Sequence, residues 1–201
     1  MFSGKIISAI VLSLAFFVSS ANVSFAEKRG FKVASLEKKS FRRTSKQRTM
    51  PPFAYIKFCV QNPGACKGSS GRLATKGGNV VLTAKLKSQL ASVNSSVNRK
   101  IRPVNDSGGD SWKVNVARGD CEDYVLTKRA QLIAKGWPSQ SLAIAVVRTR
   151  RGEGHAVLVV NTSQGKMVLD NLVQNVRPKS QSPHRFISMQ DPGKKFGWVS
   201  L

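Results

Sequence analysis

The sequence is short of acidic residues, cysteine and histidine. It holds 10 Asp and Glu residues against 33 Lys and Arg, with three Cys and two His. No second cysteine pair and no nearby histidine joins Cys59 and Cys66 in a four-ligand zinc site, which argues against a zinc module. The apolar run from Ile6 to Val18 has 13 residues. A helix that spans a bilayer needs about 20, so this run does not predict a membrane anchor.

The first 26 residues have the organisation of a secretory signal peptide. Lys5 precedes the apolar run, and the small residues Ser24 and Ala26 occupy the positions of a cleavage site. We therefore expect cleavage near Ala26 and a periplasmic or secreted protein. Cleavage removes Lys5 and no acid, so the formal charge falls from +23 to +22. Such a charge attracts polyanions. Export favours anionic lipid, envelope polymers or an acidic protein, and nucleic acid is not expected.

The mature chain divides into an arm, residues 27–52, and a domain, residues 53–201. The arm has nine Lys or Arg residues and two acids between Glu27 and Thr49, without sustained apolar periodicity, which is typical of a flexible segment. A solvated leader without a specific partner explains the arm equally well. Pro51 and Pro52 end it, and the remaining length suits one domain with one core.

The three cysteines separate into a pair and a single residue. Cys59 and Cys66 flank Gln61-Asn62-Pro63-Gly64, a turn-forming sequence that can bring the two sulfurs together. An oxidising compartment makes this disulfide reasonable. Cys121 is then unpaired. An odd cysteine in an exported protein needs an explanation, and a nucleophile is one.

Cys121 lies in Gly119-Asp120-Cys121-Glu122-Asp123-Tyr124, which holds three of the ten acids. Apolar residues recur at helical spacing after it, and Gly136 marks a stop, so we predict a helix over residues 120–135. Asp120 is expected to cap this helix. The helix dipole would lower the pKa of a thiol in the first turn and favour the reactive thiolate. The alternative is that Cys121 is a small buried apolar residue.

The rest of the domain sequence predicts a mixture of helix and antiparallel sheet. Leu86, Leu90, Val93 and Val97 are spaced as on a helix over residues 83–100. Three short segments rich in β-branched residues, 142–147, 155–161 and 166–170, are separated by turns and predict an antiparallel meander. The middle segment is apolar on both faces and should be buried. Residues from 177 onward are expected to add a strand or cover the sheet. The predicted class is α+β.

The meander brings a histidine and an acid together. His155 begins the middle strand and Asp170 ends the next, so antiparallel pairing places them within one or two residues of register. If the helix tip packs there, His155 can take the proton of the Cys121 thiol while Asp170 orients the imidazole. A structural histidine and a turn-capping acid are the alternatives. The other histidine, His184, is an alternative base, although its loop setting predicts a solvated surface residue.

These residues resemble the bacterial transglutaminase-like cysteine peptidases. The resemblance is carried by residues 119–124, by Gly154-His155-Ala156-Val157-Leu158 and by Leu169-Asp170-Asn171, in the order Cys, His, Asp. It covers roughly residues 53–201. It implies a papain-like α+β fold and a triad of Cys121, His155 and Asp170. It also implies a periplasmic protease that releases surface adhesins under control of a receptor in the inner membrane. The strong basicity and the basic arm depart from that pattern.

The proposed thiol chemistry requires no cofactor. Calcium is the one possible addition. The resemblance implies that Asp120 and Glu122 bind calcium, with Asp123 as a further ligand. Independently, three carboxylates beside Cys121 oppose a thiolate, and a bound hard cation would offset them. The alternative is that Asp120 and Glu122 cap the helix while His155 compensates.

Three functions remain open at this stage. The first is an exported cysteine peptidase that hydrolyses an envelope or surface protein through an acyl-enzyme. The second is an amide-transferring relative, in which an amine takes the acyl group in place of water. The third is a non-enzymatic envelope-binding module that uses the basic charge of the mature chain.

Overall fold

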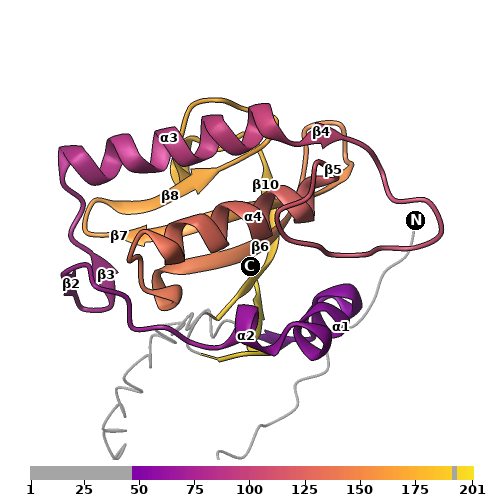
Figure 1. Cartoon of the computed structure of the whole chain (residues 1–201), viewed down its shortest axis with the longest axis horizontal. Coiled ribbons are helices and arrows are strands. Elements are labelled where there is room, and N and C mark those ends of the chain that lie inside the picture. Colours follow the sequence, from indigo (N-terminus) through magenta and orange to yellow (C-terminus); the bar gives the residue numbers. More distant parts are fainter. Residues whose placement is uncertain (1–46, 192–193) are drawn as a thin grey trace, which may run out of the picture. The chain divides into compact units, whose positions relative to one another are not determined.

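The computed structural model describes residues 47–191 and 194–201. The predicted signal peptide and the predicted arm up to residue 46 lie outside the described residues. Within the described part, no helix has the length and apolar character needed to cross a membrane. The helices are α1 (Phe53–Gln61), α2 (Pro63–Cys66), α3 (Ala84–Lys100) and α4 (Cys121–Ala134), with the 3-10 turns η1 (Ser139–Ser141) and η2 (Lys179–Gln181) (Figure 1). The strands are β1 (Arg48–Thr49), β2 (Thr75–Lys76), β3 (Asn79–Val80), β4 (Arg102–Pro103), β5 (Arg118–Gly119), β6 (Leu142–Arg148), β7 (Gly154–Thr162), β8 (Gly165–Leu169), β9 (Arg177–Pro178), β10 (Arg185–Gln190) and β11 (Trp198–Ser200).

One curled sheet organises the described part of the chain. The order β1-β11-β10-β6-β7 runs through antiparallel pairs, and β8 and β9 continue from the other side of β7. The predicted meander is confirmed, because β6, β7 and β8 pair antiparallel in chain order. Residues from 177 onward add three strands to the sheet, β9, β10 and β11. Strands β4 and β5 form a separate parallel pair.

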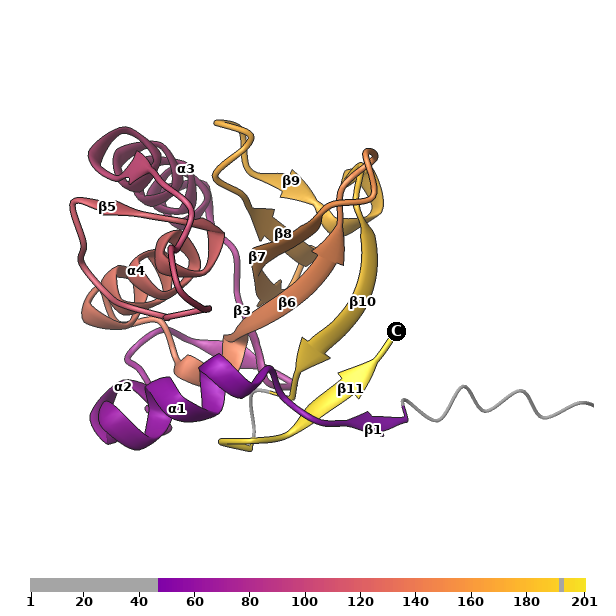
Figure 2. The same cartoon turned by 90° about the vertical axis from the view of Figure 1, so that its right-hand side faces the viewer.

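Helices α3 and α4 pack side by side over one face of the sheet (Figures 1 and 2). Helix α4 contacts β7, and α3 contacts α4 and β8. Helix α3 begins after Thr83, whose hydroxyl accepts a hydrogen bond from the Leu86 N–H at 3.3 Å. Helix α4 ends before Gly136, which adopts a positive φ of 94° that favours glycine. Both helices therefore lie within one residue of their predicted bounds.

The core is divided by the alternation of side chains along the strands. One set packs under the helices and includes Leu142, Ile144, Leu158 and Leu169. The residues between them point to the opposite face and form a second cluster there: Ala143, Ala145, Val147, Val157, Val159, Val168 and Met189. All of the second cluster comes from β6, β7, β8 and β10, which curl around it (Figure 2). Strand β7 is buried on both faces, as predicted.

Two links fasten the N-terminal part of the domain. A disulfide joins Cys59 in α1 to Cys66 in α2, with their Cα atoms 5.6 Å apart, which confirms the predicted pairing. Before α1, Arg48 and Thr49 pair with Val199 and Trp198 of β11. The last residues of the predicted arm are therefore part of the sheet, ahead of the predicted start of the domain at residue 53.

Candidate active site

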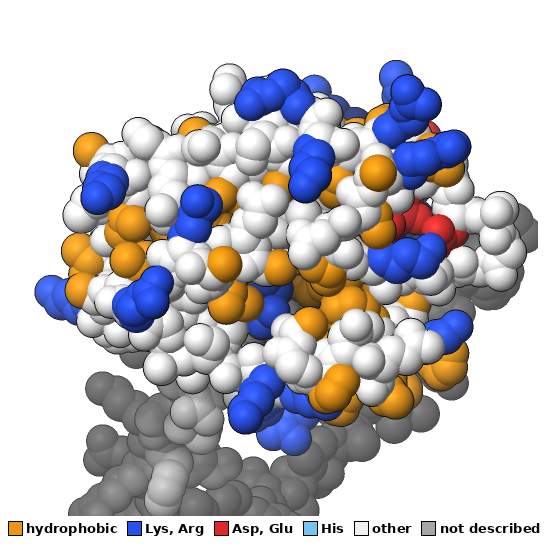
Figure 3. Space-filling view, viewed as in Figure 1, with side chains coloured by type: hydrophobic (Ala, Val, Ile, Leu, Met, Phe, Trp, Pro, Cys, Tyr) orange, Lys and Arg blue, Asp and Glu red, His pale blue; other side chains and the backbone are white. Residues whose placement is uncertain are grey.

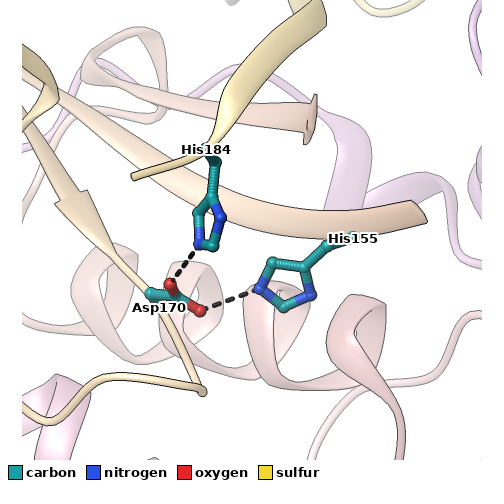
Figure 4. A group of neighbouring side chains, drawn as sticks. All are labelled: His155, Asp170 and His184. Atoms are coloured by element: carbon teal, nitrogen blue, oxygen red, sulfur yellow. Dashed lines mark hydrogen bonds and ion pairs between the residues drawn. The ribbon is translucent and has the colours of Figure 1, made fainter. Parts of the chain in front are cut away.

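His155 and Asp170 meet at one edge of the sheet. Leu169, the last residue of β8, pairs with Leu158 of β7, so Asp170 follows beside the residues just after His155. The Nε2 atom of His155 lies 2.8 Å from Oδ1 of Asp170 (Figure 4). Both side chains are nearly inaccessible, with 5% and 6% exposed. The structure thus brings this pair together within the predicted register.

The second histidine also contacts Asp170, so the prediction of a solvated surface His184 is wrong. His184 lies in the segment that leads into β10, and its Nε2 atom is 2.8 Å from Oδ2 of Asp170 (Figure 4). Its side chain is 6% exposed. The two imidazole rings pack edge to face, with their centroids 5.3 Å apart. The site is therefore a carboxylate between two histidines.

Hydrogen bonds hold Asp170 in its ionised form. Burial alone would raise its pKa, but hydrogen bonds from His155, from the Leu172 N–H and from His184 outweigh burial and lower the pKa to about 2. An ionised carboxylate only accepts hydrogen bonds. The Nε2 atom of His155 must therefore carry the proton in this pair. Its Nδ1 atom is left as the position that can take a proton from a nucleophile.

Cys121 is the first residue of α4, where the sequence predicts it. It is a free, half-buried cysteine. The backbone of Ala156, the residue after His155, lies close enough to the sulfur to favour the thiolate, and the thiol donates to Oε2 of Glu122 at 3.0 Å. The helix tip and the start of β7 therefore meet at the sulfur.

The pKa of the Cys121 thiol is raised, whereas the helix dipole was expected to lower it. Burial is the largest cause, followed by the negative charge of Glu122 and the hydrogen bond to it, while the backbone of Ala156 acts in the opposite direction. This agrees with the expectation that neighbouring carboxylates oppose a thiolate. In this arrangement burial and the neighbouring carboxylates favour the protonated thiol over the thiolate.

The acids around Cys121 repel one another. Burial and a hydrogen bond with Asp120 raise the pKa of Glu122 to about 7. Burial raises the pKa of Asp123 to about 6, and the charges of Asp120 and Asp106 add to the effect. The negative charges of Asp120 and Asp106 also raise the pKa of Asp110, for which burial is again the largest cause. In the face shown in Figure 3, acidic surface is confined to small areas at one side, among many basic side chains.

The side chain of Asp120 does not cap α4, so that prediction is wrong. Asp120 is the residue before the helix, but its side chain accepts no capping hydrogen bond from a backbone N–H of the first turn. It pairs with Glu122 instead. Asp123 turns toward the preceding loop, where its Oδ1 accepts a hydrogen bond from the Lys113 N–H at 2.7 Å.

The donor chemistry of this acidic group fits calcium. Hard carboxylate oxygens are the ligands that calcium prefers, and the negative charge of Asp120 adds to burial in raising the pKa values of Glu122 and Asp123. Asp120 and Glu122 are not part of the lining of a polar cavity of about 490 Å³ beside the group. Its charged lining consists of three acids and three basic residues: Asp106, Asp110, Asp123, Lys57, Lys113 and Arg118. Asp120 and Glu122 share a hydrogen bond, Glu122 also contacts the thiol, and Asp123 contacts Lys113.

Lys128 is a buried charge near the site that sequence reasoning missed. It lies in α4 with 0% of its surface exposed. Its Nζ atom has no hydrogen-bond partner among the described residues. Burial lowers its pKa to about 7, against the charge of Asp170, which raises it. Trp112 is a buried core residue packed edge to face on Tyr55.

A helix that begins at a free cysteine, packed on an antiparallel sheet that presents histidine and aspartate, defines the class of papain-like thiol enzymes. Residues 45–201 match the family described as bacterial transglutaminase-like cysteine proteinase, BTLCP. The match covers most of the chain, and the chain belongs to this family. The expected transglutaminase-like cysteine peptidase fold is thereby confirmed.

Solved structures of LapG from Legionella pneumophila are similar to this chain. One has a TM-score of 0.50 and 26% identity, over 57% of this chain and 68% of LapG. A calcium-bound LapG has a TM-score of 0.48 and 27% identity, over 52% of this chain and 64% of that one. An EGTA-treated LapG has a TM-score of 0.47 and 28% identity, over 52% and 62%. The chain thus spans less than two thirds of the last two structures. No curated protein matches the sequence.

Proposed function

We propose that this protein is an exported cysteine peptidase that hydrolyses peptide bonds of an envelope or surface protein, with Cys121, His155 and Asp170 as its triad. The observation that carries the proposal is the 2.8 Å contact between His155 and an ionised Asp170. Cys121 supports it, since its sulfur lies against the backbone of the residue that follows His155. Membership of a cysteine proteinase family supports the same chemistry.

The reaction divides into acylation and hydrolysis. In the first step, the thiol proton of Cys121 moves to Nδ1 of His155, and the sulfur attacks the scissile carbonyl carbon. Collapse of the tetrahedral intermediate breaks the C–N bond, leaves a thioester and releases an amine that takes the proton from His155. Water then gives a proton to His155 and attacks the thioester, so the new carboxylic acid leaves and the thiol is restored. The Cys121 N–H, at the start of α4, is suited to stabilise both oxyanions.

Asp170 orients His155 throughout these steps. Its accepting oxygen fixes the proton on Nε2, which leaves Nδ1 free for the thiol, and its negative charge stabilises the imidazolium that forms. Replacing Asp170 by Asn would put an amide at this position that presents either an oxygen or an N–H group. The tautomer would then no longer be determined.

The decisive test is labelling of Cys121 with a thiol-reactive peptide-like probe. We expect His155→Ala and Asp170→Asn to slow the labelling at pH 7 by about 100-fold or more, because removal of a triad member costs several orders of magnitude in rate. Cys121→Ser removes the label, and Asp191→Asn serves as a matched acid outside the triad. Equal labelling of wild type, His155→Ala and Asp170→Asn would exclude an activated thiol.

Calcium is proposed as a modulator held by Asp120 and Glu122, with Asp123 as a further ligand. The bound ion would supply positive charge that offsets the carboxylates beside the thiol. LapG has been solved both calcium-bound and EGTA-treated, but the proposal rests on the charge of this chain's own acids. Chelation should then slow alkylation of Cys121, and added calcium should restore it. A rate that chelator leaves unchanged would remove calcium from the proposal.

The substrate and partners are part of the proposal. A surface adhesin is the proposed substrate class, and an inner-membrane receptor is the proposed regulator. The predicted signal peptide and the Cys59–Cys66 disulfide support export to the periplasm or beyond, because disulfides persist in oxidising compartments. The mass of the product separates hydrolysis from transfer to an amine. Salt-sensitive binding to anionic polymers that Cys121→Ser leaves unchanged would favour the envelope-binding module instead.

A further inference from the structure

Asp170 receives hydrogen bonds at both of its oxygens, and the two oxygens have different partners. Oδ1 accepts from His155 at 2.8 Å and from the Leu172 N–H at 3.0 Å. Oδ2 accepts from His184 at 2.8 Å. His155 comes from β7 and His184 from the segment before β10, so two distant parts of the chain converge on one carboxylate (Figure 4).

We propose that His184 is a positioning residue that fixes the plane of the Asp170 carboxylate, so that Oδ1 faces Nε2 of His155. This rests on the proposed function. A carboxylate rotates readily about its last torsion, and two hydrogen bonds to Oδ1 alone leave that rotation weakly restrained. The hydrogen bond at Oδ2 is the additional restraint. The site is therefore an extended set of Cys121, His155, Asp170 and His184.

The tautomer of His184 suits it to a positioning role. Because Asp170 is ionised, the Nε2 atom of His184 must be the donor. Its Nδ1 atom is buried and has no hydrogen-bond partner among the described residues. A proton taken up at Nδ1 would be an unsatisfied buried donor, which is costly. With Nε2 bonded to Asp170 and Nδ1 buried without a partner among the described residues, His184 is not arranged to exchange protons with a substrate.

Charged groups lie near Asp170 and His184 on several sides. Lys128 in α4 acts on Asp170 from the helix side. A cavity beside His184 is lined by charged residues of the β6–β7 turn and the β9 strand, namely Arg150, Arg151, Glu153 and Arg177. The contribution of His184 therefore has to be isolated by a change that alters the Nε2 donor and leaves these charges in place.

His184→Gln and His184→Leu make this comparison in the full chain. The side-chain amide of Gln can place an N–H close to the imidazole Nε2 position, whereas Leu fills similar space without a donor. We expect His184→Leu to lower the maximal rate of Cys121 inactivation by the peptide-like probe about 10-fold, with the concentration for half-maximal rate unchanged, because misplaced reactive groups cost rate more than binding. His184→Gln should recover most of the rate. Wild-type rates in His184→Leu would overturn the proposal.

A double-mutant cycle separates positioning through Asp170 from a general structural effect. In the Asp170→Ala background, His184→Leu should have no further effect on the inactivation rate, since the side chain that it orients is gone. An equal loss in both backgrounds would show that His184 does not act through Asp170, and would overturn the proposal.

A measurement that does not depend on the reaction of Cys121 tests the positioning role separately from the peptidase proposal. In wild type, the His155 Nε2–H should give a hydrogen-bonded proton NMR signal that exchanges slowly with water. His184→Leu should speed that exchange or broaden the signal, and His184→Gln should retain it. If the triad variants label like wild type, the peptidase proposal fails while this NMR difference still supports positioning. An identical signal in wild type and His184→Leu overturns the positioning role in either case.

Discussion

Lys128 is expected to destabilise the protein at neutral pH. It lies fully buried in α4, its Nζ has no hydrogen-bond partner among the described residues, and the Tyr124 ring centroid is 5.8 Å away. Burial lowers the pKa of Lys128 from 10.5 to about 7 in the folded state. Between these two pH values the unfolded chain binds one proton more than the folded chain. The free energy of unfolding therefore gains a contribution that rises with pH across this window.

The size of the effect follows from the two pKa values of Lys128. At about 1.36 kcal/mol per pKa unit, the interval between 10.5 and about 7 corresponds to roughly 5 kcal/mol of lost stability at low pH. Lys128→Met keeps an unbranched side chain and removes the amine. Replacing even a paired buried charge by well-packed apolar residues is often neutral or stabilising by about 1–4 kcal/mol, and Lys128 has no hydrogen-bond partner in the described part of the chain. We expect a gain in this range at pH 6.5.

Urea unfolding of wild type and Lys128→Met, followed by tryptophan fluorescence at pH 6.5 and pH 9.5, measures this directly. The advantage of the variant should shrink by about 3 kcal/mol between the two pH values, because the wild-type lysine is neutral at the higher pH. Other titrating groups are common to both proteins and cancel in the difference. A stability difference that does not change with pH would refute the assignment of Lys128 as a buried, destabilised cation.

Three further predictions concern the disulfide, a close backbone approach and the ionised carboxylate. Replacing Cys59 and Cys66 by Ala should lower the free energy of unfolding by about 2–3 kcal/mol, as expected for a short closed loop, and reducing agent should then have no further effect on urea unfolding. A Cβ atom at Gly119 would lie 2.1 Å from Oδ2 of Asp123, so Gly119→Ala should displace Asp123 and lower the melting temperature, whereas Gly64→Ala, where a Cβ meets nothing within 4 Å, should leave it nearly unchanged. The pKa of Asp170 is lowered from 3.8 to about 2, which corresponds to about 2 kcal/mol of stability that is present above pH 4 and lost as pH falls toward 2. Acid titration of unfolding should show Asp170→Asn lacking this loss, and parallel curves for the two proteins would contradict it.

The elements that carry the proposed triad were predictable because local patterns determine them. Helix α4 has apolar residues at helical spacing and a glycine stop, and the β7–β8 hairpin has a short turn that sets its register. That register predicts that His155 and Asp170 lie close together. Cys121 followed from being the odd cysteine at the start of a helix.

The remaining features depend on contacts that local patterns do not determine. His184 reaches Asp170 because the segment before β10 folds back over the sheet, and nothing in its loop-like sequence signals that return. The thiol pKa depends on burial and on the direction in which Glu122 points. The local sequence around Lys128 is typical of a solvated helix residue. Only the packing of α3 and α4 on the sheet removes Lys128 from water.

The pairing of β1 with β11 joins residues about 150 positions apart in the sequence. Contacts of this separation close a large loop and form late in folding. In a chain made from its N-terminus, β1 is synthesised long before its partner and lacks these hydrogen bonds until β11 follows. Until β11 docks, the edge of β10 that receives it is also unpaired, and such an edge can pair with another chain.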